Sequence, residues 1–174
     1  MNIACILAEG FEDSELRIPL NRLTAAGHRV VIIGKQKGEE LVGKRGKERV
    51  RADESIDAAD PGDYQALLIP GGKSPEHLRA DERFVRFVQR MDEEGKLVAA
   101  VCHGPQILLT AGLVRGRTMT AWKTVQVDLR QAGAHVVDRE VVVDENLVTS
   151  RKPDDLEAFS REILNELSEL AARR

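Results

Sequence analysis

The chain has 174 residues, a length typical of one folded domain, and its 42% hydrophobic and 32% charged residues exclude a disordered or fibrous protein. Its formal net charge is −3, and lysines and arginines are interspersed with acids, which leaves no concentrated positive field for nucleic acid or an anionic membrane. We therefore predict a single domain over residues 1–174 that binds no nucleic acid and no membrane.

The amino-terminal residues and the two cysteines indicate the cellular compartment. The apolar start is interrupted at Glu9 and has no basic leading segment, so neither an export signal nor a membrane span is predicted. Cys5 and Cys102 each lie in an apolar run, and neither has a second ligand at a metal-binding spacing. We expect a cytoplasmic protein with free thiols and no metal site. A Cys5–Cys102 disulfide is the less favoured alternative.

In the first half of the chain, apolar runs of strand length alternate with segments of helical periodicity. In chain order, the pattern predicts a strand over 2–8, a helix over 12–26, a strand over 28–33, a surface hairpin within 34–52 and a strand over 64–70.

The same alternation continues to the carboxyl terminus. The predicted elements are a helix over 81–94, a strand over 96–101, helices over 103–111 and 123–132, strands over 140–144 and 146–150, and a closing helix over 154–170. Because most of the strands are apolar on both faces, we expect a mostly parallel central sheet between two helix layers, with a small surface hairpin.

Three loops follow predicted strands and contain residues suited to chemistry. They are GFEDSE over 10–15, PGGKSPE over 70–76 and CHGP over 102–105. In open α/β sheets, ligands and reactive groups gather at the carboxyl ends of the strands. We expect these three loops to form one site.

The strongest single indication is Cys102 in the run AVCHG, where small residues flank a nucleophile between a buried strand and a helix. This pattern is similar to a nucleophile elbow. A helix amino terminus stabilises negative charge, so we expect the pKa of this thiol to fall and Cys102 to be a reactive thiolate. The alternative is an inert core cysteine.

His103 and the paired glycines are candidates for the remaining catalytic tasks. His103 is an obvious base, although neighbouring side chains at such a turn seldom point at one another. Its backbone N–H and that of Gly72 are candidates for an oxyanion hole. For Gly71 and Gly72, simple turn chemistry explains the sequence equally well.

Glu12 and Glu15 lie three residues apart at the start of the first predicted helix, on a face that opens onto the carboxyl end of the sheet. Acids are common in the first helical turn because they favour the helix dipole, and this is the simplest interpretation of both.

The motifs ILAEGFEDSE, LLIPGG followed by SPEHLR, VAAVCHGPQILL, VRGR and VVVDENLVTSRKPDDL, in this order, closely resemble the PfpI family of intracellular protease-like proteins. This family belongs to the superfamily of the Parkinsonism-associated protein deglycase and is related to class I glutamine amidotransferase domains. The resemblance covers nearly the whole chain. It implies a flavodoxin-like three-layer sandwich in which Cys102 is the nucleophile and a protonated Glu15 donates a hydrogen bond to its sulfur.

The resemblance also implies assembly into dimers or larger rings, in which an acid after the PGG turn reaches the histidine of a neighbouring subunit. Glu76 matches that acid, and His103 matches the histidine. If Glu76 orients His103 across an interface, the geometric objection to His103 weakens. Trp122 falls where the family often places an aromatic residue near the pocket, although core packing explains it equally well.

We therefore predict a cofactor-independent enzyme in which Cys102 attacks a carbonyl carbon. The resemblance implies two substrate classes, namely glyoxal or methylglyoxal with their protein adducts, and peptides; we favour the carbonyls, because stress-response members share the EDSE and SPxxLR patterns. The competing hypothesis is a redox sensor or stress-protective protein that acts through oxidation of Cys102.

Overall fold

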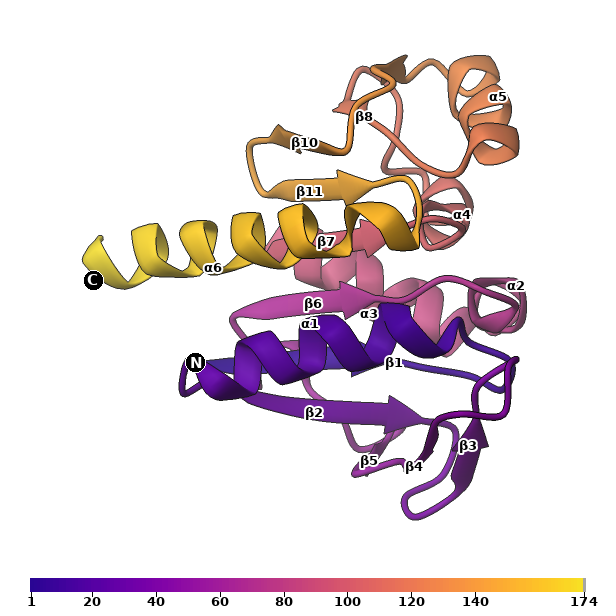
Figure 1. Cartoon of the computed structure of the whole chain (residues 1–174), viewed down its shortest axis with the longest axis vertical. Coiled ribbons are helices and arrows are strands. Elements are labelled where there is room, and N and C mark those ends of the chain that lie inside the picture. Colours follow the sequence, from indigo (N-terminus) through magenta and orange to yellow (C-terminus); the bar gives the residue numbers. More distant parts are fainter. Residues whose placement is uncertain (174) are drawn as a thin grey trace.

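The computed structural model describes residues 1–173 and contains a seven-stranded sheet in the order β10-β11-β7-β6-β1-β2-β5 (Figure 1). All neighbouring strands are parallel except β10, which runs antiparallel to β11. The strands are β1 (Asn2–Ile6), β2 (Arg29–Gly34), β5 (Glu54–Ser55), β6 (Ala66–Ile69), β7 (Leu97–Val101), β10 (Val141–Asp144) and β11 (Leu147–Ser150).

Helices cover both faces of this sheet. The α-helices of the chain are α1 (Asp13–Ala25), α2 (Ser74–Leu78), α3 (Glu82–Glu93), α4 (Pro105–Thr110), α5 (Lys123–Gln131) and α6 (Leu156–Ala172). In Figure 1, α1 and α6 lie in front of the sheet and α3 lies behind it. The predicted flavodoxin-like three-layer sandwich, with a mostly parallel sheet and helices on both faces, is therefore confirmed.

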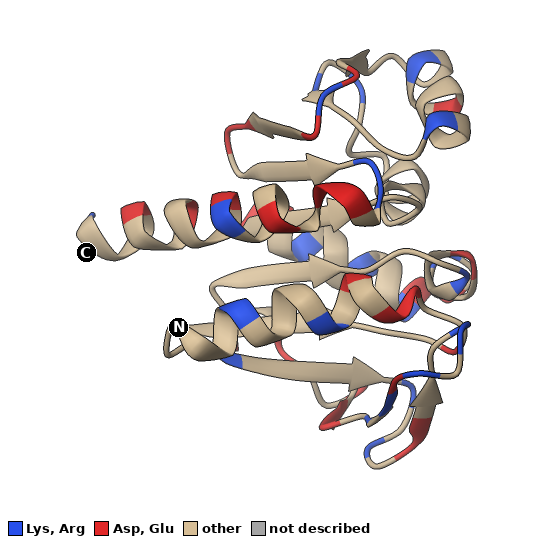
Figure 2. Ribbon diagram, in the orientation of Figure 1, with Lys and Arg blue, Asp and Glu red and all other residues tan. Residues whose placement is uncertain are grey.

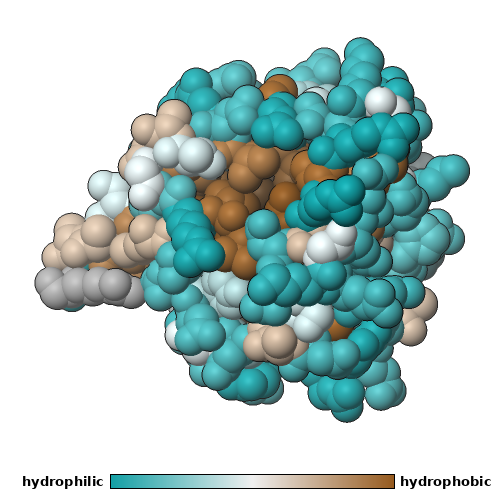
Figure 3. All heavy atoms as spheres, turned by 90° about the horizontal axis from the view of Figure 1, so that it is seen from below, coloured by the Kyte–Doolittle hydropathy of each residue, from teal (hydrophilic) through white to brown (hydrophobic). Residues whose placement is uncertain are grey.

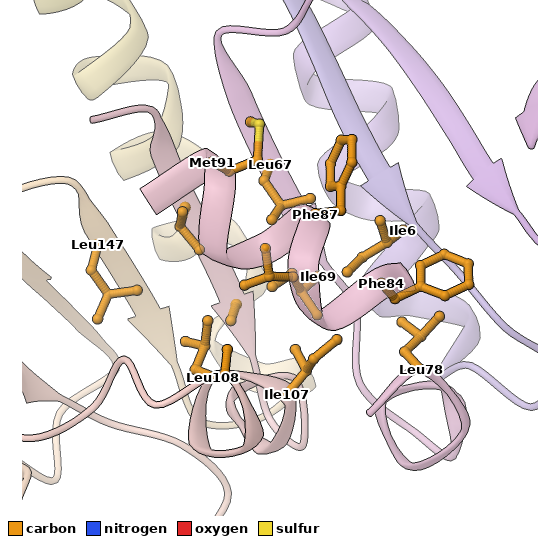
Figure 4. Packing of buried hydrophobic residues seen from close by; sticks show 14 of the residues in the cluster. Ile6, Leu67, Ile69, Leu78, Phe84, Phe87, Met91, Ile107, Leu108 and Leu147 are labelled. Atoms are coloured by element: carbon orange, nitrogen blue, oxygen red, sulfur yellow. The ribbon is translucent and has the colours of Figure 1, made fainter. Parts of the chain in front are cut away.

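Each face of the sheet has its own apolar layer because consecutive side chains of a strand point to opposite faces. Cys5 and Leu68 pack with Leu16 of α1 and Phe159 of α6. On the opposite face, strand residues meet the apolar stripe of α3, together with α4 (Figure 4). The residues labelled there are Ile6, Leu67, Ile69, Leu78, Phe84, Phe87, Met91, Ile107, Leu108 and Leu147.

Several short elements lie outside this frame. The expected surface hairpin is present as β3 (Glu40–Val42) and β4 (Arg49–Arg51), which pair antiparallel. A second small sheet pairs β8 (Thr118–Met119) with β9 (His135–Val136), and 3₁₀ turns cover Pro61–Asp63 and Pro153–Asp155. Among residues 1–173, no helix combines the length and the apolar character that crossing a bilayer requires.

The strand register brings the three chemically interesting loops together. Cys5 of β1 is level with Leu68 of β6, and Ile69 of β6 is level with Ala100 of β7. These three strands are adjacent and parallel, so the loops that follow them all leave the sheet at the carboxyl ends of the strands, along one edge. In Figure 1 this edge lies on the right, next to α2, α4 and the hairpin.

Candidate active site

Cys102 occupies a strained turn directly after β7. Its φ of 63° lies in the left-handed region, which side chains other than glycine seldom adopt. The turn is held on both sides, because the Cys102 N–H donates to the Ser150 carbonyl at 3.0 Å and the Trp122 N–H donates to the Cys102 carbonyl at 3.0 Å. A Cβ on Gly104 would lie 2.6 Å from the Ile69 carbonyl oxygen, so only glycine fits there. The surroundings thus hold Cys102 in this backbone conformation.

Glu15 lies in the first turn of α1 and is fully buried. Its Oε1 accepts the Gly71 N–H at 2.8 Å, and the carboxyl also interacts with the Cys102 side chain. Its Oε2 is buried and has no well-aligned hydrogen bond within residues 1–173. Burial, helped by the charge of Glu12, raises the pKa of Glu15 to about 8. At neutral pH the carboxyl therefore holds a proton, and its free oxygen is placed to carry it.

The ionisation of Cys102 differs from the sequence-based prediction. Burial raises the pKa of the Cys102 thiol, an ionised Glu15 raises it further, and only the His103 backbone N–H and the Lys44 charge lower it. The expectation that the turn by itself lowers this pKa was wrong, because Cys102 is only 8% exposed and lies next to a carboxyl group. Protonation of Glu15 removes its charge as a cause that disfavours the Cys102 thiolate, so the two groups ionise as a coupled pair.

His103 lies against the sulfur within the same subunit. Its Nδ1 is 3.3 Å from Cys102 Sγ, so the expectation that these neighbouring side chains would not meet was wrong. The unusual backbone of Cys102 turns the two side chains together, and the imidazole stacks on the Trp122 indole with centroids 6.3 Å apart. Burial and the Lys44 charge lower the pKa of His103, whereas the Glu76 charge opposes this. A neutral imidazole can accept the thiol proton.

Gly71 and Gly72 have a steric reason to be glycine. A Cβ on Gly71 would lie 2.5 Å from Glu15 Oε1, and one on Gly72, which has a φ of 74°, would collide with the Glu12 N–H. The Gly71 N–H is already bonded to Glu15. Within residues 1–173, neither the Gly72 N–H nor the His103 N–H donates to a backbone carbonyl, and the His103 N–H interacts with the Cys102 sulfur. These two groups remain candidates for holding an oxyanion.

Glu12 is a buried ion-pair partner rather than a plain helix-start acid. It is 4% exposed, and Lys44 and Arg45 of the β3–β4 turn bind its two carboxyl oxygens at 2.8 and 2.6 Å. Burial raises the pKa of Glu12, but these cations more than offset it and hold the pKa below its ordinary value. Lys44, Arg45 and Asp13 are neighbours of the site that the sequence reasoning missed. The acid at Asp13 and the basic run GKRGK were the available signals.

Glu76 lies close enough for its charge to act on His103, but it makes no direct contact with that side chain in the described part of this subunit. Glu76 is exposed in the first turn of α2, and no hydrogen bond joins it to His103 within the described part of this subunit. Its predicted role across an interface stays a prediction. Trp122 is half-buried and forms a wall of the site against His103, in addition to packing on both apolar layers.

Cys5 lies apart from this chemistry. It is fully buried in β1, and burial raises the pKa of its thiol. Both cysteines are free, so the alternative of a Cys5–Cys102 disulfide is not realised.

Known proteins show a consistent likeness to this chain. The profile of the DJ-1/PfpI family matches residues 1–166. The chain is 50% identical over 163 residues to protein/nucleic acid deglycase 2 of Escherichia coli, covering 93% of this chain and 95% of that one. It is 49% identical over 163 residues to general stress protein 18 of Bacillus subtilis, with the same coverage.

Solved structures agree with this likeness. A two-domain protein from Anabaena variabilis, with DJ-1/ThiJ/PfpI-like and ferritin-like domains, superposes with a TM-score of 0.94 and 42% identity; the match covers 96% of this chain and 48% of that one, so this chain spans about half of that protein. Drosophila melanogaster DJ-1beta gives a TM-score of 0.88 at 28% identity and covers 95% of this chain and 89% of that one. This chain is a member of the DJ-1/PfpI family.

Proposed function

We propose that this protein is a cofactor-independent, cysteine-dependent enzyme of the stress response that acts on reactive carbonyls such as glyoxal and methylglyoxal or on their adducts with proteins. The observation that carries the proposal is the constellation around Cys102, in which a strained turn presents the sulfur 3.3 Å from His103 Nδ1 and beside the buried Glu15. The names of the deglycase and stress-protein relatives support the substrate class.

The first chemical step is the attack of the Cys102 sulfur on the carbonyl carbon. The thiol proton passes to His103 Nδ1, a carbon–sulfur bond forms, and the carbonyl π electrons move onto the oxygen. The N–H groups of Gly72 and His103 hold the developing oxyanion until it takes up a proton, which gives a hemithioacetal. The imidazolium of His103 is the nearest source of that proton.

Glu15 supports this step by remaining neutral. A pKa of about 8 leaves the carboxyl mostly protonated at pH 7, so its O–H can donate to the sulfur as negative charge develops there. A carboxylate at the same place would oppose the charge. The raised pKa of Glu15 therefore serves the nucleophile directly.

We also propose that the site is completed in a homo-oligomer, with Glu76 of one subunit orienting His103 of the next. Glu76 is exposed on the short helix α2 at the same edge of the sheet as Cys102, where a second copy can reach it. The surface also carries an apolar hollow ringed by hydrophilic residues, of a kind that marks contacts between proteins (Figure 3).

The deciding experiment compares product formation from methylglyoxal and from a fluorogenic peptide, with wild type, Cys102→Ala and Cys5→Ala. We expect methylglyoxal turnover in wild type and Cys5→Ala and none in Cys102→Ala. Turnover of the peptide alone would identify a peptidase. The absence of any Cys102-dependent product would reject the enzyme and favour the redox-sensing alternative.

A further inference from the structure

The β3–β4 hairpin is fastened to the start of α1 instead of projecting freely into solvent. Asp13 is 4% exposed, and its Oδ1 accepts the Arg45 N–H at 2.9 Å. Its Oδ2 accepts the N–H groups of Lys47 and Glu48, each also at 2.9 Å. One buried carboxylate thus accepts three backbone N–H groups from a single turn, a strong and charge-assisted arrangement.

Neighbouring contacts show that the turn is shaped around this carboxylate. A Cβ on Gly43 would collide with the Asp13 carboxyl group, so a side chain there would push the turn away. The Lys44 N–H donates to the Phe11 carbonyl at 2.8 Å, and the Gly10 N–H donates to the Val42 carbonyl at 3.0 Å. The turn is therefore held to the loop that precedes α1 as well as to the helix itself.

The three hydrogen bonds from the turn to Asp13, the Asp13 clamp, hold two cations at the edge of the Cys102 site. Lys44 Nζ lies 2.8 Å from Glu12 Oε2, and Arg45 Nε lies 2.6 Å from Glu12 Oε1. Figure 2 shows the basic turn and the acidic start of α1 side by side. The Glu12 N–H in turn donates to the Gly71 carbonyl at 3.3 Å, and Gly71 holds Glu15. A continuous chain of contacts thus joins the hairpin to Glu15, which lies beside Cys102.

We propose that Asp13 is a positioning residue, which clamps the 43–48 turn so that the Lys44 ammonium is held on Glu12 and increases the reactivity of Cys102. The inference rests on the proposed role of Cys102 as nucleophile. The charged and titratable groups that act on this sulfur are Glu15 of α1, His103 on its own turn and Lys44 from the hairpin. Glu12 acts on Glu15 and pairs with Lys44. Glu76 of α2 acts on His103.

The direction of the effect follows from charge. Lys44 favours the thiolate of Cys102, and it also favours the ionised form of Glu15. Its removal should therefore shift both ionisations to higher pH. For one charge at the edge of a partly buried site, we expect a shift of about half a pH unit or more. Loss of the Asp13 clamp should give a smaller shift in the same direction, because a released Lys44 spends less time over the site.

The test measures the rate of Cys102 alkylation by iodoacetamide against pH, in a Cys5→Ala background. The variants are Lys44→Met, Asp13→Asn and their combination. Arg49→Met is the matched control, because it removes a cation from the same hairpin that pairs with the exposed Glu40 at 2.8 Å. Because alkylation needs no substrate, a failure of the proposed enzymatic function would leave this readout intact.

We expect Lys44→Met to move the alkylation curve to higher pH, Asp13→Asn to move it less, and the double variant to coincide with Lys44→Met. Arg49→Met should follow the background curve. The proposal is overturned if Lys44→Met leaves the alkylation curve in place. It is also overturned if Asp13→Asn shifts the curve by the same amount in the Lys44→Met background as in the protein that keeps Lys44. If Asp13→Asn does not fold, Gly43→Ala takes its place, because it displaces the turn while keeping the Asp13 carboxylate. It must then give the shift of the alkylation curve that is expected for Asp13→Asn.

Discussion

Cys5 and Cys102 share one apolar layer of the protein but lie in different chemical surroundings. Cys5 lies inside β1, level with Ile32 on one side and Leu68 on the other. Cys102 lies past the end of β7, where the sheet stops and the chain turns with a φ of 63°. Burial raises the pKa of both thiols. The difference is that Cys102 meets groups that can take or give a proton.

This comparison shows that the apolar run around a cysteine does not decide its reactivity. Cys102 has His103 Nδ1 at 3.3 Å and a protonated carboxyl beside it. The charge that acts on Cys5 is that of Asp53, which makes ionisation of its thiol harder. The end of a parallel strand supplies the free N–H groups and polar loops that a strand interior has already used in its ladder.

The largest expected effect is on alkylation of the two thiols in the folded protein. Iodoacetamide should modify Cys102 at least on the order of 100-fold faster than Cys5, because Cys5 is reached only when the sheet opens. Mass spectrometry of peptides after timed quenching measures both rates in one sample. Similar rates at pH 7 would remove the distinction between the two environments, and denaturant should abolish the difference.

The next effect concerns the stability cost of Glu15. Its pKa is about 8 in the folded protein and ~4.3 in the unfolded chain, so the stability that it contributes is complete below pH ~4.3 and is lost as the pH rises toward 8. At pH 7 the loss amounts to roughly 3 kcal/mol of unfolding free energy. Glu15→Gln does not titrate, and should be more stable than wild type by a margin that grows from pH 5 to pH 8.

Urea unfolding at pH 5, 7 and 8 measures this margin for Glu15→Gln. The same variant should keep part of the carbonyl-processing rate, because its amide can still donate to the sulfur, whereas Glu15→Leu should lose far more. A margin that does not change with pH would mean that Glu15 is already ionised in the native state.

The smallest effect concerns serine at the two cysteine positions. Cys5→Ser places a hydroxyl among apolar neighbours and should cost ~1–3 kcal/mol of unfolding free energy. Cys102→Ser should cost less, since Glu15 and His103 offer hydrogen-bond partners to the new hydroxyl. Urea midpoints of the two variants at pH 7 compare them directly. Equal costs would show that the Cys102 site is as apolar as the interior of β1.

The sequence predicted the long elements well because their patterns extend over many residues. The helix expected over 81–94 is α3 (Glu82–Glu93), whose Phe84, Phe87 and Met91 form the buried stripe. Shorter elements were missed, among them α2 (Ser74–Leu78), β5 (Glu54–Ser55) and the β8–β9 pair. Two to five residues are too few to show a period, and these elements form only because neighbouring segments complete them.

The composition of the site was predictable only in part. Cys102, Glu15 and Gly72 stand in motifs that mark the ends of strands, so their presence at one edge of the sheet follows from a parallel topology. The contact between His103 and the Cys102 sulfur depends on the left-handed backbone of Cys102, which no sequence pattern predicted. Lys44 lies in a polar hairpin whose sequence resembles that of an ordinary surface loop, so its place near the site was not predicted.

The sequence by itself determined the alternation of strands and helices and the place of Cys102 at a strand end, because periodicity and a strand-to-helix turn are local properties. Tertiary structure decided the ionisation of the Cys102 thiol. Burial of Glu15 against Gly71, and the clamp of Asp13 on the hairpin, join residues that are 30 or more positions apart in the chain. A pKa depends on which charges and which solvent surround a group, and only the folded chain brings those surroundings together.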